Sequence, residues 1–232
     1  MIPDAAAATA TIRRGLGITA VALIGVIAVY VLSLVFTPLE VRQGMAQKIF
    51  YVHAPSAWAA LLAFSLVGIT GALYLWLRDP RLDLFAEASA EVGLVFGTIV
   101  LTTGPIWGKP IWGTWWSWDA RLTLTLFLFF LFVGYMALRS ALHEPAERAR
   151  FSAVVGILGL VLVPFVHLSV YFFRTLHPAP VLLKPSAPSM DPRMLRTLLI
   201  SVGVFTLLYI GFVTARYGLG LLREARGAHD GD

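Results

Sequence analysis

The amino-acid sequence predicts an all-α integral membrane protein with six transmembrane helices, which we expect to form a single membrane domain over residues 1–232. Hydrophobic residues make up 58% of the chain and charged residues only 13%, with a mean hydropathy of +0.79. This composition is typical of membrane proteins. The apolar residues also gather into six runs, each close to the ~20 residues that a helix needs to cross a bilayer. Helices are expected because an isolated strand would leave its backbone groups unpaired in lipid.

The elements follow one another with short connections. The first apolar run comes after Arg13 and Arg14, and it is longer than the roughly 7–15 apolar residues of a signal peptide, so we expect a retained span. Prolines mark the ends of later spans at Pro80, Pro105 and Pro145. The longest connection, about 175–194, contains five prolines and should be extended rather than helical. The predicted spans are 16–36, 57–77, 85–107, 122–138, 151–173 and 195–217.

Six spans place both termini on one side of the membrane and the first, third and fifth connections on the other. Lys and Arg are slightly more numerous on the side of the termini, which favours cytoplasmic termini. The chain has no cysteine, so disulfides and thiolate metal sites are excluded. The net charge of +5 fits basic loops that face anionic membrane lipid. No cluster of residues suggests nucleic-acid binding.

A tryptophan-rich segment, 108–121, is predicted to form an external loop between the third and fourth spans. Four of the seven tryptophans lie within seven residues, at Trp112, Trp115, Trp116 and Trp118. Tryptophan also anchors helices at membrane interfaces, but such a belt scatters its aromatic residues more widely. Large, stiff indole rings at this density favour a stacking surface for a planar ligand.

Two histidines are predicted on the same side as the tryptophans. His53 precedes the second span, His177 follows the fifth, and each has a proline within the next two residues. Neutral imidazole is a common metal ligand, and two imidazoles suit the axial positions of a haem iron. Either histidine alone is also compatible with an interfacial residue bonded to water or backbone. Their shared side with the tryptophans favours metal ligation.

Charged residues lie on the same side. Arg121 and Arg174, with Lys109 and Arg42, are candidates to bind the carboxylates of an anionic ligand such as the propionates of haem. Each arginine is also compatible with an interface residue whose charge reaches water. Asp119 is placed to cap the fourth span, where a negative charge complements the helix dipole.

Three polar residues fall inside or close to spans. His167 lies in the fifth span, ten residues and so ~15 Å of helix from His177. Both therefore cannot ligate one iron on a straight helix, and we expect His167 to make a polar contact within the bundle. Glu87 and Glu91 lie one turn apart near the start of the third span. We interpret them as carboxylates at headgroup level, with a proton path as the alternative.

The segment 112–121 (WGTWWSWDAR) resembles the WWD signature of haem-handling proteins in cytochrome c biogenesis. With its six spans, its size and the pair His53 and His177, the chain is similar over nearly its whole length to the cytochrome c maturation protein C family, also called haem exporter protein C. The resemblance implies that the tryptophan loop holds haem b on the external face, with His53 and His177 as axial metal ligands. The cofactor-binding residues expected are Trp112, Gly113, Trp115, Trp116, Trp118, Asp119, Arg121 and Arg174.

The resemblance also implies a function and partners. The protein would present haem to the haem chaperone CcmE, acting with the ABC subunits CcmA and CcmB and the small membrane protein CcmD. Its place would be the bacterial cytoplasmic (inner) membrane, as a multi-pass protein in contact with lipid, with the haem site facing the periplasm. The sequence shows no independent catalytic constellation, so we do not expect an enzyme.

Two other function classes stay open at this point. A b-type cytochrome redox subunit would hold haem through histidines deep within its spans, and only His167 is so placed. A secondary transporter of a small anion would have broken helices and polar groups near the midplane of two related halves. The sequence shows no such halves.

Overall fold

The computed structural model describes residues 4–180, 182 and 184–229, and it confirms an all-helical chain with six helices long and apolar enough to cross a membrane. A π-helical turn, Leu32–Phe36, continues the first helix, and a 3-10 turn, Met45–Ile49, leads into the second. The six long helices are α1 Ala5–Val31, α2 Phe50–Leu77, α3 Pro80–Trp112, α4 Ala120–Ala141, α5 Pro145–Phe172 and α6 Pro192–His229.

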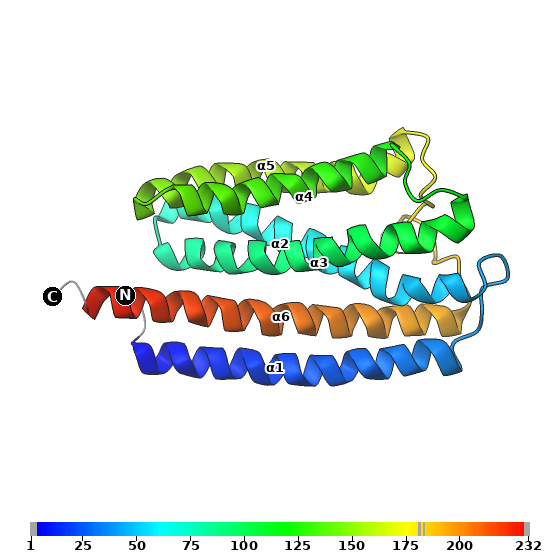
Figure 1. The fold of residues 1–232 in the computed structure, drawn as a ribbon, viewed down its shortest axis with the longest axis horizontal. Helices are drawn as coiled ribbons and strands as arrows, with labels where there is room; N and C mark the ends of the chain where they lie inside the picture. Colours follow the sequence, from blue (N-terminus) through cyan, green and yellow to red (C-terminus); the bar gives the residue numbers. More distant parts are fainter. Residues whose placement is uncertain (1–3, 181, 183, 230–232) are drawn as a thin grey trace.

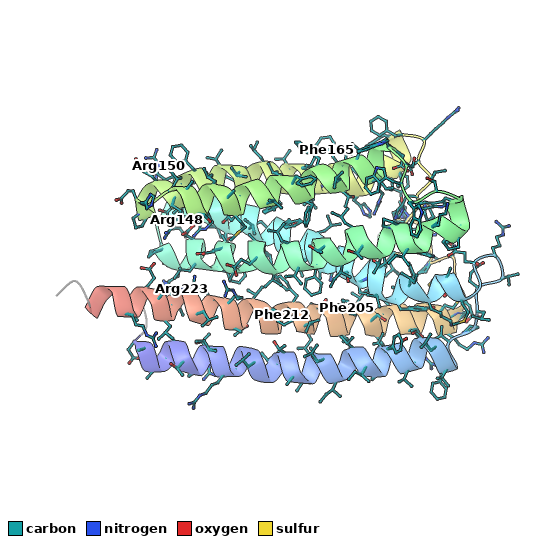
Figure 2. All side chains as sticks on the ribbon, in the orientation of Figure 1. Arg148, Arg150, Phe165, Phe205, Phe212 and Arg223 are labelled. Atoms are coloured by element: carbon teal, nitrogen blue, oxygen red, sulfur yellow. The ribbon has the colours of Figure 1, made fainter. Side chains whose placement is uncertain are left out.

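Helices α4 and α5 form one layer, α2 and α3 form the middle layer, and α6 packs on the other side of the middle layer (Figure 1). Helix α1 packs on α6, on the side away from the rest of the bundle. Helix α1 begins and α6 ends at the same end of the bundle. The segments that follow α1, α3 and α5 meet at the opposite end, which we call the loop end. Between the layers, Phe205 of α6 meets Phe96 of α3, with ring centroids 6.2 Å apart (Figure 2).

Helix α2 begins earlier than the predicted span because a proline does not stop it. The helix starts at Phe50 and contains Pro55, whereas the predicted span starts at residue 57. In membrane helices, neighbouring groups satisfy the backbone atoms that a proline leaves unpaired. His53 is therefore in the first turn of α2 rather than in the connection before it, and its position is set by a helix.

Helix α3 likewise runs through Pro105 and Pro110 and ends at Trp112. The predicted loop 108–121 is thus wrong at both ends, since its first five residues are helical and α4 already begins at Ala120. The end of α3 is set by Gly113, whose φ of 75° is a left-handed conformation that favours glycine at a helix C-terminus. The described part of 173–191 contains no helix, as its prolines predict.

Helix α4 has buried residues only from Leu128 onward. Its buried residues are Leu128, Phe132, Tyr135 and Arg139. The Phe132 ring stacks on Phe64 of α2 with centroids 3.9 Å apart and an interplanar angle of 10°. Towards the loop end α4 diverges from α3 (Figure 1). A cavity lined by residues of α2, α3 and α4 lies at this end of the bundle.

Ion pairs hold α3 to its neighbours away from the loop end. Arg139 of α4 binds Asp83 through two bonds of 2.5 and 2.9 Å and Glu87 through one of 2.9 Å. Arg216 of α6 binds Glu91, with Nη2 2.6 Å from Oε1. The interpretation of Glu87 and Glu91 as headgroup carboxylates missed these partners, because their arginines lie more than 50 residues away in the sequence.

Candidate ligand-binding site

A cavity of about 530 Å³ opens at the loop end between α2, α3 and α4. Its volume lies within the range of about 300–1,000 Å³ that is usual for small-molecule and cofactor sites. It brings together residues from three connections and four helices. The predicted site residues that line it are His53, Trp112, Trp115, Trp116, Arg121 and His177.

Below the two histidines the cavity is an apolar slot. From His53 to Phe64 the α2 wall spans eleven residues, or ~16 Å of helix. The deeper wall consists mainly of small and apolar side chains of α2, α3 and α4, namely Ala57, Ala60, Leu61, Phe64, Gly97, Val100, Leu101, Leu128 and Phe129, with Thr125 as a polar member on α4. The stacked pair of Phe64 and Phe132 marks the deep end. Such a lining suits an apolar ligand.

The hydrogen bonds of His53 determine which ring nitrogen is free. Its Nδ1 lies 2.9 Å from the hydroxyl oxygen of Thr103 on α3. That hydroxyl donates its single proton to the carbonyl of Ile99, at 2.7 Å. Thr103 must then accept from His53, so Nδ1 carries the hydrogen and Nε2 keeps its lone pair. Gly104 makes room for the ring, because a Cβ there would be 3.3 Å from His53 Cε1.

His177 reaches the same state by a different bond. Its Nδ1 lies 2.9 Å from the carbonyl oxygen of Pro178. A carbonyl can only accept, so Nδ1 again carries the hydrogen and Nε2 has the free lone pair. Burial and then the positive charge of Arg121 lower the pKa of His177 from 6.5 to about 4. The imidazole is therefore neutral near pH 7, which is the state that binds metals.

The tryptophans of the segment have different surroundings. Trp116 has a buried indole N–H with no hydrogen-bond partner among the described residues, although buried polar groups are normally paired. Trp115 is 58% exposed and lies under the Lys109 ammonium, 5.9 Å from the ring centroid. Trp112 folds back over Gly108, where a Cβ would be 2.8 Å from its ring. Trp118 lies outside the cavity, is 77% exposed, and meets the edge of Trp116.

Three other predicted residues lie outside the cavity lining. Gly113 terminates α3, and Arg174 is an exposed residue just after α5. Asp119 caps α4, as predicted, by accepting from the backbone N–H of Leu122 at 3.0 Å. Its second carboxylate oxygen accepts from the N–H of Leu176 at 3.1 Å. Both oxygens of Asp119 therefore bind backbone.

Two cations face the cavity. Arg121 and Arg42 line it. Nη1 of Arg121 donates to the carbonyl oxygen of His167 at 3.3 Å. His167 itself is not among the lining residues. Lys48, which the sequence places on the same side, instead donates to the carbonyls of Thr37 and Pro38. The cavity thus combines a largely apolar lining with two arginines, which suits an apolar ligand that carries acidic groups.

Sequence reasoning missed several residues of the site. Trp107 contacts His53 edge to face, with centroids 5.6 Å apart, and donates from its indole N–H to Gln43 at 3.0 Å. Thr103 and Gly104 shape the position of His53. Trp107 could have been predicted from the sequence, since it directly precedes the tryptophan-rich segment. Thr103 could not have been predicted, because nothing in its local sequence points to a partner 50 residues away.

Comparison with known proteins decides the family. Residues 4–230 match the family model described as heme exporter protein C. The chain belongs to the heme exporter protein C family. Relatives of that name include those of Haemophilus influenzae (38% identical over 192 residues, 83% of this chain and 78% of the relative) and Bradyrhizobium diazoefficiens (36% over 187 residues, 81% and 71%). The Escherichia coli K12 relative is 36% identical over 192 residues, 82% of this chain and 77% of its own.

Membership and fold agree on the class of protein. Six apolar helices and bacterial relatives make this a multi-pass membrane protein. The names of the relatives describe exporter components, a handling role rather than catalysis, in agreement with the prediction that the chain is not an enzyme. The family fits the expected cytochrome c biogenesis and haem transport.

Proposed function

We propose that this chain binds haem b in the cavity at the loop end and presents it to the haem chaperone CcmE during cytochrome c biogenesis. Family membership supports a role in haem delivery for cytochrome c maturation. The observation that carries the proposal is the pair of histidines. Each lines the same cavity, and each has its Nδ1–H fixed by an oxygen acceptor, which leaves both Nε2 atoms free for a metal.

The residues present fit a haem. His53 and His177 would supply the two axial nitrogens. Across the described residues, no group of three or more His, Asp or Glu is placed to hold a metal ion, so a bare ion would find an incomplete ligand set here, whereas a porphyrin brings four nitrogens of its own. Arg121 and the unpaired indole N–H of Trp116 would bind propionate oxygens. The apolar slot would receive the macrocycle.

The chemistry of a carrier also fits the ligands. Histidine ligation is reversible, and the chain has no cysteine that could trap haem by thioether bonds. Trp115 and Trp118 are exposed beside the cavity, and we propose that they contact the chaperone. The six spans would act as one membrane domain, with CcmA, CcmB and CcmD as the other members of the complex.

Orientation follows from the distribution of charge. Helix α1 begins and helix α6 ends at the same end of the bundle (Figure 1). Lys and Arg are slightly more numerous in the connections on that side. The positive-inside tendency then favours termini in the cytoplasm. We propose that the loop end faces the periplasm, with the protein in the bacterial inner membrane.

The test is a haemin titration of the purified protein in lipid nanodiscs, followed by its absorption spectrum. We expect a low-spin six-coordinate spectrum that is lost in His53→Ala and in His177→Ala. His167→Ala is the control and should keep that spectrum, because His167 is outside the cavity lining. A spectrum lost only with His167→Ala would overturn the proposal and favour a redox haem within the spans.

A further inference from the structure

We propose that Asp119 is a positioning residue, which fixes the segment that carries His177 and does not itself contact the ligand. The proposal rests on the proposed function of His177 as an axial ligand. Asp119 is the last residue of the tryptophan-rich connection, directly before α4. It does not line the cavity, and each of its carboxylate oxygens accepts a backbone N–H from a different part of the chain.

The two bonds of Asp119 join elements that the sequence separates. Oδ1 accepts from Leu122 at 3.0 Å and so belongs to the first turn of α4. Oδ2 accepts at 3.1 Å from Leu176, 57 residues further on and immediately before His177. Bonds from a carboxylate to backbone N–H groups are charge-assisted and stronger than neutral ones. The side chain therefore connects α4 to the segment after α5.

The segment that carries His177 needs such a connection. Among the described residues, the other hydrogen bonds next to His177 are local, from Thr175 Oγ1 to the His177 carbonyl at 3.0 Å and from His177 Nδ1 to the Pro178 carbonyl. Local bonds orient the ring relative to its own backbone, but they do not fix that backbone relative to the cavity. His53 differs, because it is built into α2 and bonded to α3. The bond from Leu176 to Asp119 gives His177 a comparable anchor.

The first turn of α4, from which Asp119 projects, is itself fixed by hydrogen bonds. Arg121, two residues after Asp119, donates to the carbonyl of His167 on α5 at 3.3 Å, and the backbone N–H of Thr123 bonds to the Asp119 carbonyl at 3.0 Å. Asp119 thus projects from a fixed helix terminus. Asp119 positions His177 through the bond from the Leu176 N–H to Oδ2. Loss of that bond should therefore free the His177 segment and leave His53 in place.

The variant that separates the two bonds is Asp119→Ser. Serine is a good N-cap and preserves the bond to Leu122, but its side chain is too short to reach Leu176 as well. The matched control is Asp79→Ser at the N-cap of α3, at the opposite end of the bundle, where the carboxylate accepts from Arg81. Both variants lose one capping carboxylate. Only the first loses the connection to the His177 segment.

The first measurement is made without haem. Because the chain has no cysteine, Ala179→Cys gives a single site for a nitroxide label beside His177. We expect Asp119→Ser to increase the mobility of the label in its electron paramagnetic resonance spectrum, and Asp79→Ser to leave it unchanged. An equally immobile label in Asp119→Ser would overturn the proposal. This result stands whether or not the chain binds haem.

The second measurement asks whether Asp119 acts through His177. We expect Asp119→Ser to weaken low-spin haemin binding roughly ten- to hundredfold, the size expected for one charge-assisted bond. In a His177→Gly background, added imidazole replaces the missing ligand and needs no anchor, so half-saturation by imidazole should be the same with Asp or Ser at 119. A persistent loss of binding in that background would overturn the proposal, because it would place Asp119 in direct contact with haem.

Discussion

At the scale of single residues, the site depends on hydrogen bonds that determine the tautomer of each histidine. Thr103 accepts from His53 only because its own proton is committed to the Ile99 carbonyl. Oxygen partners of this kind orient metal-binding histidines and raise their basicity. A threonine in the middle of an apolar helix thereby becomes part of the site.

The first prediction concerns Thr103. Thr103→Val keeps the shape of the side chain but removes the acceptor, so the His53 ring is no longer fixed. We expect haemin affinity to fall about ten- to hundredfold, as is typical when such a partner is lost. Thr103→Ser, which retains the hydroxyl, should restore most of the affinity. Equal binding by the valine and serine variants would show that the hydroxyl has no such function.

The second prediction concerns the titration of His177. Burial and Arg121 lower its pKa to about 4 in the folded protein, against 6.5 for a free side chain. Between these values the unfolded chain binds more protons, so the stability that the neutral ring contributes is present above pH 6.5 and is lost as the pH falls through 4. We expect the His177 ring resonance, assigned with His177→Gln, to shift near pH 4. A midpoint near 6.5 would contradict this environment.

At the scale of elements, the cavity exists because α4 is held to α3 at one end and diverges from it at the other. The buried half of α4 contains Phe132, Tyr135 and Arg139, whereas its first two turns contain no buried residue. The apolar slot between the diverging halves has walls of small side chains on α2, such as Ala57 and Ala60. The walls of the slot are thus formed by helices rather than by a loop.

The third prediction tests the slot by filling it. Ala57→Phe places a large ring in the cavity just below His53, and we expect haemin binding to be lost while the protein still inserts and folds. Ala72→Phe is the matched control on the same helix, because Ala72 is exposed and outside the cavity. Unchanged binding by Ala57→Phe would mean that the ligand does not enter the slot.

The fourth prediction tests the ion pairs through which Arg139 holds the C-terminal end of α4 to α3. Arg139→Met would leave Asp83 and Glu87 without their shared cation, and removing one partner of a buried ion pair costs about 3–5 kcal/mol. We expect a large fall in melting temperature in detergent. Arg81→Met, at the exposed pair with Asp79, should change it far less, since exposed ion pairs stabilise weakly. If the two variants lowered the melting temperature equally, Arg139 would not stabilise the contact between α3 and α4 more than a surface ion pair does.

At the scale of the whole molecule, hydropathy alone predicted six membrane helices, because bilayer thickness determines helix length. The same argument gave the shared side of His53, His177 and the tryptophans, since it needs only the number of spans. Helix ends were harder to predict. Pro55, Pro105 and Pro110 lie inside helices, where the packed bundle overrides the local preference of proline.

The sequence pointed to candidate ligand residues that line the cavity, but not to the residues that position them. Imidazole can bind metals and indole can stack on planar ligands, and the span count put His53, His177 and Trp116 on one side, so all three could be chosen as candidates from the sequence. Thr103 acts through a bond across 50 residues, and such pairs are set by three-dimensional packing. Arg174, which charge and proximity also suggested as a ligand contact, is exposed and lies outside the cavity lining.

In the proposed site, two histidines that lie 124 residues apart in the sequence, His53 and His177, ligate one haem iron. The most direct measurement is the low-temperature electron paramagnetic resonance spectrum of the ferric haemin-loaded protein. We predict a low-spin spectrum of two axial imidazoles, replaced by a high-spin signal in either His53→Ala or His177→Ala and recovered when imidazole is added. A low-spin signal that persists in the double variant would contradict the account.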